Sequence, residues 1–212
     1  MPEETPRPYG TLLLFLFWGL LLAAVFFWML PDRITVPPEL QGVLRPAPQP
    51  LQAFELTDQH RQPASLERLQ GKWNFVFFGY TYCPDICPTT LSTLTRVVRQ
   101  LESDPQGRAQ IQVVFVSVDP GRDTPEVIAD YLKYFNEAFL GLSGTQQEID
   151  GLSRQFGAGY MKEPDTKPGQ YLVSHTSSIF LVDPQGRLLA AFSPPHDPGT
   201  IVDQFRQIRS LF

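Results

Sequence analysis

The feature that most constrains the fold of this chain is a pair of cysteines placed directly after an apolar run. The motif Cys83-Pro84-Asp85-Ile86-Cys87-Pro88 follows the run Trp73-Asn74-Phe75-Val76-Phe77-Phe78, and the chain has no other cysteine. The run predicts a buried strand, and the apolar residues after the motif recur at helical spacing: Leu91, Leu94, Val97, Val98 and Leu101. A strand that leads through a short loop into a helix is the unit of an open α/β fold, and ligands bind at that junction. The two sulfurs are therefore predicted at the mouth of a packed core.

Two kinds of chemistry fit the cysteine pair, reversible disulfide formation and capture of a soft metal ion. Residues four apart in a helical turn have Cα atoms about 6 Å apart, which is within disulfide range. Because Pro88 disfavours helical backbone at Cys87 and is favoured at a first helical position, we expect the helix to start at Pro88. Cys87 would then lie at the positive end of the helix, where thiolate is favoured over thiol. The alternative is a purely structural role, in which the cysteines form a permanent disulfide or are two buried thiols that only fill space in the core.

The composition excludes one large class of function. The chain has 212 residues, a formal net charge of −5 and 18% charged residues, with its basic residues scattered. Nucleic-acid-binding proteins concentrate basic residues in a patch or stripe, which this sequence lacks. The length suits one domain with a full core plus appendages.

Residues 11–30 form a long apolar segment without a charged residue. As a helix, this segment would span about 30 Å, which matches the hydrocarbon thickness of a bilayer. A cleaved signal peptide is the alternative, but the segment is longer than a usual signal-peptide core and no small-x-small cleavage site follows it. We predict an uncleaved transmembrane anchor at 11–30 after a short tail at 1–10. Because a redox-active or copper-loaded cysteine pair suits an oxidising compartment, we expect a single-pass protein of a bacterial inner membrane with its C-terminal domain on the periplasmic side.

The rest of the chain divides into a linker and a domain. Residues 31–50 contain six prolines and predict an extended, proline-rich linker, because such a stretch can hold neither a helix nor a central strand. From residue 51 strand and helix patterns alternate. Strands are predicted at 54–57, 74–78, 111–118, 176–182 and 188–192, and helices after the cysteines, from Thr124-Pro125, at 146–156 and at 200–211. This is the element order of thioredoxin, so we predict an α/β, thioredoxin-like domain at 51–212.

Of the three histidines, His175 is the candidate third ligand. His60 lies in a polar turn and is expected to be solvated, and His196 precedes the last predicted helix. His175 leads into the strand predicted at 176–182, and in a thioredoxin-like fold the loop entering that strand lies against the cysteine loop. Two thiolates and one imidazole form a trigonal set that suits Cu(I), with Cu(II) possible when a further ligand is added. Zinc usually requires four ligands in a closed structural site, and the sequence offers no fourth Cys or His nearby.

The chain resembles the Sco/SenC family of membrane-anchored copper proteins. The resemblance is carried by Phe77-Phe78-Gly79-Tyr80-Thr81-Tyr82 with the cysteine motif, Val116-Ser117-Val118-Asp119-Pro120, Asp123-Thr124-Pro125, and His175 with Leu181-Val182-Asp183-Pro184-Gln185-Gly186. It implies one copper ion per chain held by Cys83, Cys87 and His175, with Asp85 as a group that orients these ligands. It also implies as partners the cytochrome c oxidase subunit that holds the dinuclear copper centre, and an upstream copper donor or thiol reductant. Ser174 departs from the family pattern, in which many members carry an acid before the histidine.

Two functions of different classes follow from the cysteines and His175. The first is a copper metallochaperone that delivers copper to the oxidase centre during assembly and is not a turnover enzyme. The second is a thiol-disulfide oxidoreductase that reduces the partner's copper-ligand cysteines, with Cys83 and Cys87 as the redox-active pair. Copper transfer needs His175, whereas disulfide exchange needs the cysteines alone. A peroxiredoxin-like peroxidase is disfavoured because no basic residue lies close in sequence to activate Cys83.

Overall fold

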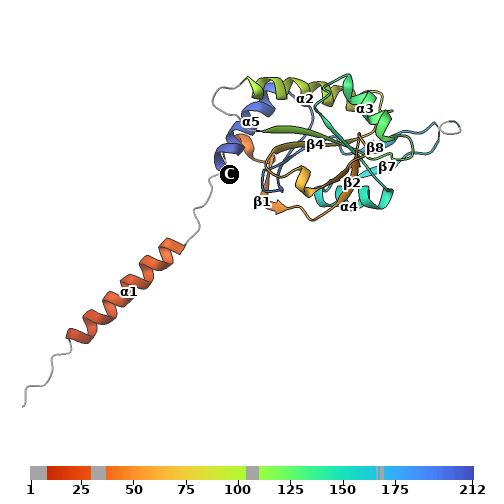
Figure 1. Cartoon of the computed structure of the whole chain (residues 1–212). Helices are drawn as coiled ribbons and strands as arrows, with labels where there is room; N and C mark the ends of the chain where they lie inside the picture. The colour runs from red at the N-terminus through yellow and green to blue at the C-terminus, as the bar shows by residue number, and fades with distance from the viewer. Residues whose placement is uncertain (1–8, 30–36, 104–109, 166, 168–169) are drawn as a thin grey trace, which may run out of the picture. The chain divides into compact units, whose positions relative to one another are not determined.

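The structure is a computed structural model, and it describes residues 9–29, 37–103, 110–165, 167 and 170–212. The chain splits into two compact units, residues 1–36 and 37–212. The described part of the first unit is one helix, α1, which spans Tyr9–Met29 (Figure 1). No helix within the described ranges is both long enough and apolar enough to cross a membrane. The anchor predicted at 11–30 therefore stays a prediction, while residues 1–8 of the predicted tail and residues 31–36 of the predicted linker lie outside the described residues.

The second unit is built on an eight-stranded mixed sheet with the order β1-β10-β9-β4-β5-β6-β2-β3. The strands are β1 (Leu44–Pro50), β2 (Glu55–Asp58), β3 (Pro63–Ser65), β4 (Trp73–Gly79), β5 (Ile111–Ser117), β6 (Leu140–Ser143), β9 (Ile179–Val182) and β10 (Arg187–Phe192). The central strands β4, β5 and β6 are parallel, and β9 runs antiparallel to β4. Every residue of β4 is buried, as the apolar run predicts.

Four helices complete the second unit: α2 (Ile86–Glu102), α3 (Pro125–Lys133), α4 (Gln146–Phe156) and α5 (Pro198–Leu211), with short 3-10 turns at Pro38–Leu40 and Leu66–Arg68. Figure 1 shows α2 and α3 over one face of the sheet and α4 on the opposite face. Local signals set two helix starts. Thr124 accepts a hydrogen bond from the Val127 amide, and Thr145 forms a capping box with Glu148. The α/β, thioredoxin-like prediction is confirmed.

The prediction of an extended linker is wrong for residues 37–50. Leu40 is fully buried, and residues 44–50 form β1, which pairs antiparallel with β10 at one end of the sheet. Proline cannot donate a ladder hydrogen bond, so it is excluded from central strands. It is tolerated in an edge strand, because half of the amides there face away from the partner strand. The folded unit therefore begins at residue 37 and not at residue 51.

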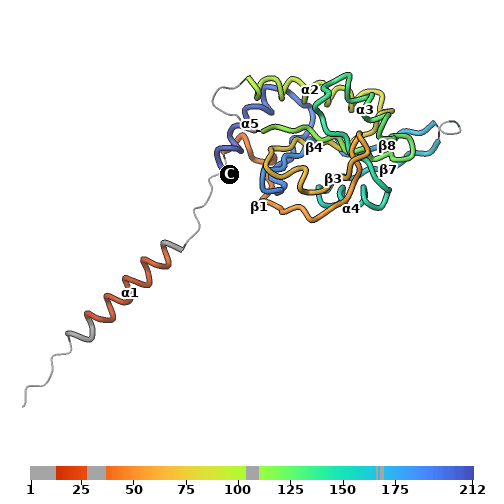
Figure 2. The backbone as a smooth tube through the Cα atoms, viewed as in Figure 1, coloured from red at the N-terminus to blue at the C-terminus, as the bar shows by residue number. Residues whose placement is uncertain are grey.

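A second, two-stranded sheet carries the histidine of interest. Strand β7 (Tyr160–Lys162) pairs antiparallel with β8 (Val173–His175), and Tyr160 lies opposite His175. This β7–β8 hairpin lies on the side of the unit away from the C-terminus, as the backbone trace in Figure 2 shows. The strand predicted at 176–182 is shorter than expected and begins at Ile179, so His175 belongs to the hairpin and not to the main sheet.

Candidate metal centre

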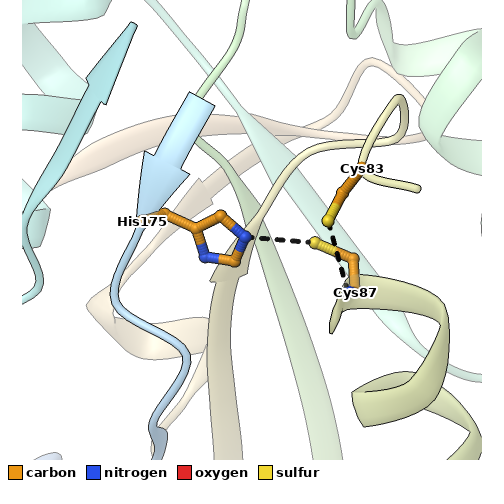
Figure 3. Close-up of side chains that lie close together, drawn as sticks. All are labelled: Cys83, Cys87 and His175. Atoms are coloured by element: carbon orange, nitrogen blue, oxygen red, sulfur yellow. Dashed lines mark hydrogen bonds between the residues drawn. The ribbon is translucent and has the colours of Figure 1, made fainter. Parts of the chain in front are cut away.

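The structure brings together the three residues that the sequence identifies. Cys83, Cys87 and His175 each offer one ligand atom, and these atoms all lie within 4.8 Å of one another. Figure 3 shows Cys83 on the loop after β4, Cys87 at the start of α2 and His175 at the end of β8, with its ring facing the sulfurs. The sulfur of Cys87 lies 3.5 Å from Nε2 of His175. Cys83 and Cys87 are not joined in a disulfide.

The helix after the cysteines begins two residues earlier than predicted. It starts at Ile86, with Asp85 as its N-cap, so Cys87 lies within the first turn and Pro88 follows it. The first-turn amides of a helix have no intrahelical acceptor, so a proline at the third position costs no hydrogen bond. The amide of Cys87 instead faces the sulfur of Cys83 at 3.5 Å. The sulfur that accepts a hydrogen bond from the N-terminus of α2 is therefore that of Cys83.

The two cysteines differ in acidity, and Cys83 is the more acidic of the pair. The hydrogen bond from the Cys87 thiol lowers the pKa of Cys83 far below its usual value, and the backbone amides of Cys87 and Asp85 lower it further. The same hydrogen bond, with burial, raises the pKa of Cys87. Cys87 is fully buried whereas Cys83 is half-buried. The predicted thiolate at Cys87 is thus wrong, because the hydrogen bond to Cys83 and burial together outweigh the helix dipole at that sulfur.

His175 is oriented for metal binding by its second ring nitrogen. Its Nδ1 lies 3.1 Å from the carbonyl oxygen of Thr176, which can accept a hydrogen bond only when Nδ1 carries the proton. That tautomer leaves the lone pair of Nε2 pointing toward the sulfur of Cys87. The imidazole packs edge-on against the rings of Phe77 and Tyr80, each with its centroid 5.8 Å away. The orientation of the imidazole ring is therefore set by these contacts in the protein without metal.

Asp123 supports the cysteine loop and was not singled out as a site residue in the sequence. Its carboxylate accepts hydrogen bonds from the Thr81 amide at 3.0 Å, the Thr81 hydroxyl at 2.6 Å and the Ser117 hydroxyl at 2.6 Å. It is 1% exposed, and burial raises its pKa. Its place in the resemblance, in Asp123-Thr124-Pro125, was the available signal, but only the fold shows that the side chain reaches back to Thr81.

The other candidate residues lie outside the group of three. The side chain of Asp85 is exposed and caps no amide of α2, while its backbone amide faces Cys83. His60 is exposed, as predicted, and Nε2 of His196 lies 2.8 Å from the Ser177 carbonyl oxygen. Ser174, which stands where an acid was expected, donates a hydrogen bond to Glu163. The carboxylate beside Ser174 is therefore that of Glu163, in the connection between β7 and β8.

The geometry of the three donors fits a soft, low-coordinate ion. Ligand atoms at about 2.0–2.3 Å from a central ion in a trigonal arrangement are separated by about 3.5–4 Å. The nitrogen and the Cys87 sulfur already have this spacing, and the widest separation needs to shrink by about 1 Å at most. Among the described residues no other group of His, Cys, Asp or Glu side chains is arranged in this way. Two thiolates and one imidazole match Cu(I) better than a four-coordinate zinc site.

Comparisons with known proteins agree with this geometry. The SCO1/SenC family model matches residues 44–210. A putative copper-binding protein of Stutzerimonas stutzeri is 39% identical over 77% of this chain and 79% of its own length. The mitochondrial protein SCO2 of Saccharomyces cerevisiae is 36% identical over 73% of this chain, which spans about half (51%) of that relative. The crystal structure of yeast Sco1 with copper bound is similar with a TM-score of 0.71 and 33% identity, covering 78% of this chain and 91% of that one.

Proposed function

The chain belongs to the SCO1/SenC family, and from this premise we propose that it binds one copper ion through Cys83, Cys87 and His175. The observation that carries the proposal is the convergence of two sulfurs and one imidazole nitrogen within 4.8 Å. The name of the Stutzerimonas relative and the copper in yeast Sco1 support the choice of metal. With Cu(I) and two thiolates the centre carries a net charge of about −1, which the N-terminus of α2 partly offsets.

Anaerobic titration of the full chain in detergent with Cu(I) and with Cu(II) tests this proposal. We expect one copper per chain and thiolate-to-copper charge-transfer absorption. The variant His175→Ala should lose tight Cu(II) binding while its cysteines remain oxidisable, because it removes the nitrogen donor only. His60→Ala is the matched control, since His60 is exposed and lies outside the site. Unchanged copper affinity in His175→Ala would contradict the assignment.

The biological role that we propose is that of a metallochaperone for the dinuclear copper centre of cytochrome c oxidase. Three ligands leave a coordination position through which an incoming thiolate can bind before a resident ligand leaves. Cys83 and His175 are half-buried and so remain within reach of a partner, whereas the buried Cys87 holds the ion from the core side. The test is transfer: the copper-loaded chain should metallate the copper-free oxidase subunit in the presence of a chelator that stops free copper from doing so.

A second function, thiol-disulfide exchange, is favoured by the asymmetry of the cysteine pair. A half-exposed thiolate beside a buried thiol is the arrangement of an attacking and a resolving cysteine. Cys83 would attack a partner disulfide and release one partner thiolate. Cys87 would then lose its proton and attack the mixed disulfide, which leaves a Cys83–Cys87 disulfide and a reduced partner. Reduction of a copper-free partner by His175→Ala at the wild-type rate would separate this activity from copper transfer.

We also propose that residues 11–30 anchor the chain as a single-pass helix in a bacterial inner membrane, with the second unit on the periplasmic side. The uncharged sequence and the exposed apolar side chains of residues 13–27 support this proposal. Extraction of the full chain from membranes at alkaline pH, and protease accessibility of the second unit in spheroplasts, are the tests. Release at alkaline pH would contradict the anchor.

A further inference from the structure

Arg122 lies between the two halves of the metal centre. The cysteines and His175 approach the site from separate elements, the loop into α2 and the end of β8 (Figure 3). The guanidinium carbon of Arg122 lies 4.9 Å from the ring centroid of Tyr82 and 5.6 Å from that of Tyr80, on the cysteine loop. It lies 3.6 Å from the ring centroid of Tyr171, in the segment that leads into β8. One cation therefore contacts aromatic rings on both sides of the centre.

Hydrogen bonds fix the guanidinium in this position. Its Nε donates to Asp119 at 2.5 Å, and its Nη1 donates to the Tyr171 carbonyl oxygen at 3.0 Å. The hydroxyl of Tyr171 in turn donates to the other oxygen of Asp119 at 2.8 Å. Only 18% of the Arg122 side chain and 7% of the Asp119 side chain are exposed. Arg122, Asp119 and Tyr171 thus form a closed hydrogen-bonded circuit whose two charged members are largely shielded from solvent, where charge-assisted bonds are strong.

The turn that carries Arg122 also holds the cysteine loop directly. Asp123, the next residue, binds the backbone and side chain of Thr81. Tyr80 makes the direct contact across the centre, because its ring packs edge-on against His175 and its hydroxyl bonds to the Val173 backbone. Arg122 lies against the rings of this loop and, through Tyr171, against the histidine segment. The turn therefore reaches both halves of the centre through polar contacts, from Asp123 to Thr81 and from Arg122 to Tyr171.

We propose that Arg122 is a positioning residue that holds the β7–β8 hairpin, and with it His175, against the cysteine loop. The planar guanidinium can stack on the rings while two of its edges donate hydrogen bonds, which a lysine ammonium cannot do. The copper-binding part of this inference rests on the proposed function, whereas the geometric part concerns the protein without metal. If Arg122 acted only through its charge, a lysine would serve equally well.

Arg122→Lys in the full chain in detergent tests the inference, because it keeps the positive charge and removes the planar guanidinium with its several N–H donors. Without metal, we expect amides of the β7–β8 hairpin to exchange with deuterium at least tenfold faster than in the wild type. Copper affinity, measured by competition with a chromophoric Cu(I) chelator, should fall about tenfold, as for other groups that orient metal ligands. The matched control is Arg187→Lys. Arg187 pairs with buried Asp183 at the β9–β10 turn, beyond the end of β9 that lies away from His175, and this variant should change neither quantity.

The outcomes test the positioning role of Arg122 separately from the proposed copper binding. Wild-type exchange and wild-type copper affinity in Arg122→Lys overturn the inference, as does an equal loss in Arg187→Lys. Should Arg122→Lys fail to fold, Tyr171→Phe removes only the hydroxyl that bonds Asp119, and unchanged hairpin exchange in that variant overturns the inference as well. If the wild type itself binds no copper, the proposed function fails, while the exchange comparison still decides the role of Arg122.

Discussion

Gly79→Ala should disturb the metal centre through one added methyl group. Gly79 is the last residue of β4, and a Cβ atom built on it would lie 2.7 Å from the sulfur of Cys87. It would also lie 3.0 Å from ring atoms of Phe77 and Phe115, both of which are fully buried. Ordinary van der Waals contact begins at 3.4 Å, so the sulfur has to retreat by about 0.7 Å. The rings cannot yield in its place because the core around them is closed.

The size of the effect follows from this displacement. Overpacking a closed core costs about 1–3 kcal/mol of stability. A functional constellation tolerates displacements of only about 0.5 Å, so a shift of this size should weaken copper binding about tenfold or more. The free energy of unfolding is measured by urea denaturation, and copper affinity is measured by anaerobic competition with a Cu(I) chelator.

Gly141→Ala is the matched control, because it should destabilise the fold without disturbing the metal centre. A Cβ atom there would overlap the side chains of Ile128 and Leu132, where β6 meets α3, and no residue of the metal centre is among its nearest neighbours. We expect Gly141→Ala to lose at least as much stability as Gly79→Ala while retaining wild-type copper affinity. Wild-type affinity in Gly79→Ala, or equal loss of affinity in both variants, would refute the reasoning.

Three further predictions concern the thiolate of Cys83, the cysteine loop and the 3-10 turn that precedes the edge strand β1. The pKa of Cys83 is lowered by folding, so the stability that its thiolate contributes is full above the unfolded pKa of about 8.5 and is lost as the pH falls through the folded pKa. At about pH 6 the copper-free chain should therefore show the ultraviolet absorbance of one thiolate, which Cys83→Ser removes; a signal that appears only above pH 8 contradicts this. Asp123→Ala leaves the buried hydroxyl of Ser117 and the half-buried donors of Thr81 unpaired and should cost about 2–3 kcal/mol in urea unfolding, with a cost below 1 kcal/mol counting against its role. Leu40→Ala should cost about 2–5 kcal/mol because Leu40 is fully buried, and a neutral result would return residues 37–50 to the linker.

The elements that the sequence predicted well are those set by local signals. The helix at 146–156 has the predicted bounds because its apolar spacing, its Thr145 cap and the glycine that ends it all lie within residues 145–157. The buried strand at β4 and the junction that carries the cysteines were visible for the same reason. His175 was found through the thioredoxin order, which is itself a sum of local patterns.

Tertiary structure decided the features that depend on partners distant in the chain. The prolines of β1 form a strand only because β10, more than 130 residues later, supplies the other half of the ladder. The hydrogen bond between the cysteines and the deeper burial of Cys87, which no spacing reveals, assign the thiolate to Cys83 and not to Cys87. The contact between Cys87 and His175, and the circuit of Arg122, Asp119 and Tyr171 beside it, join residues about 50 to 90 positions apart. The sequence alone determined which atoms can bind a soft metal, but only the packing of the hairpin against the cysteine loop brings them within reach of one ion.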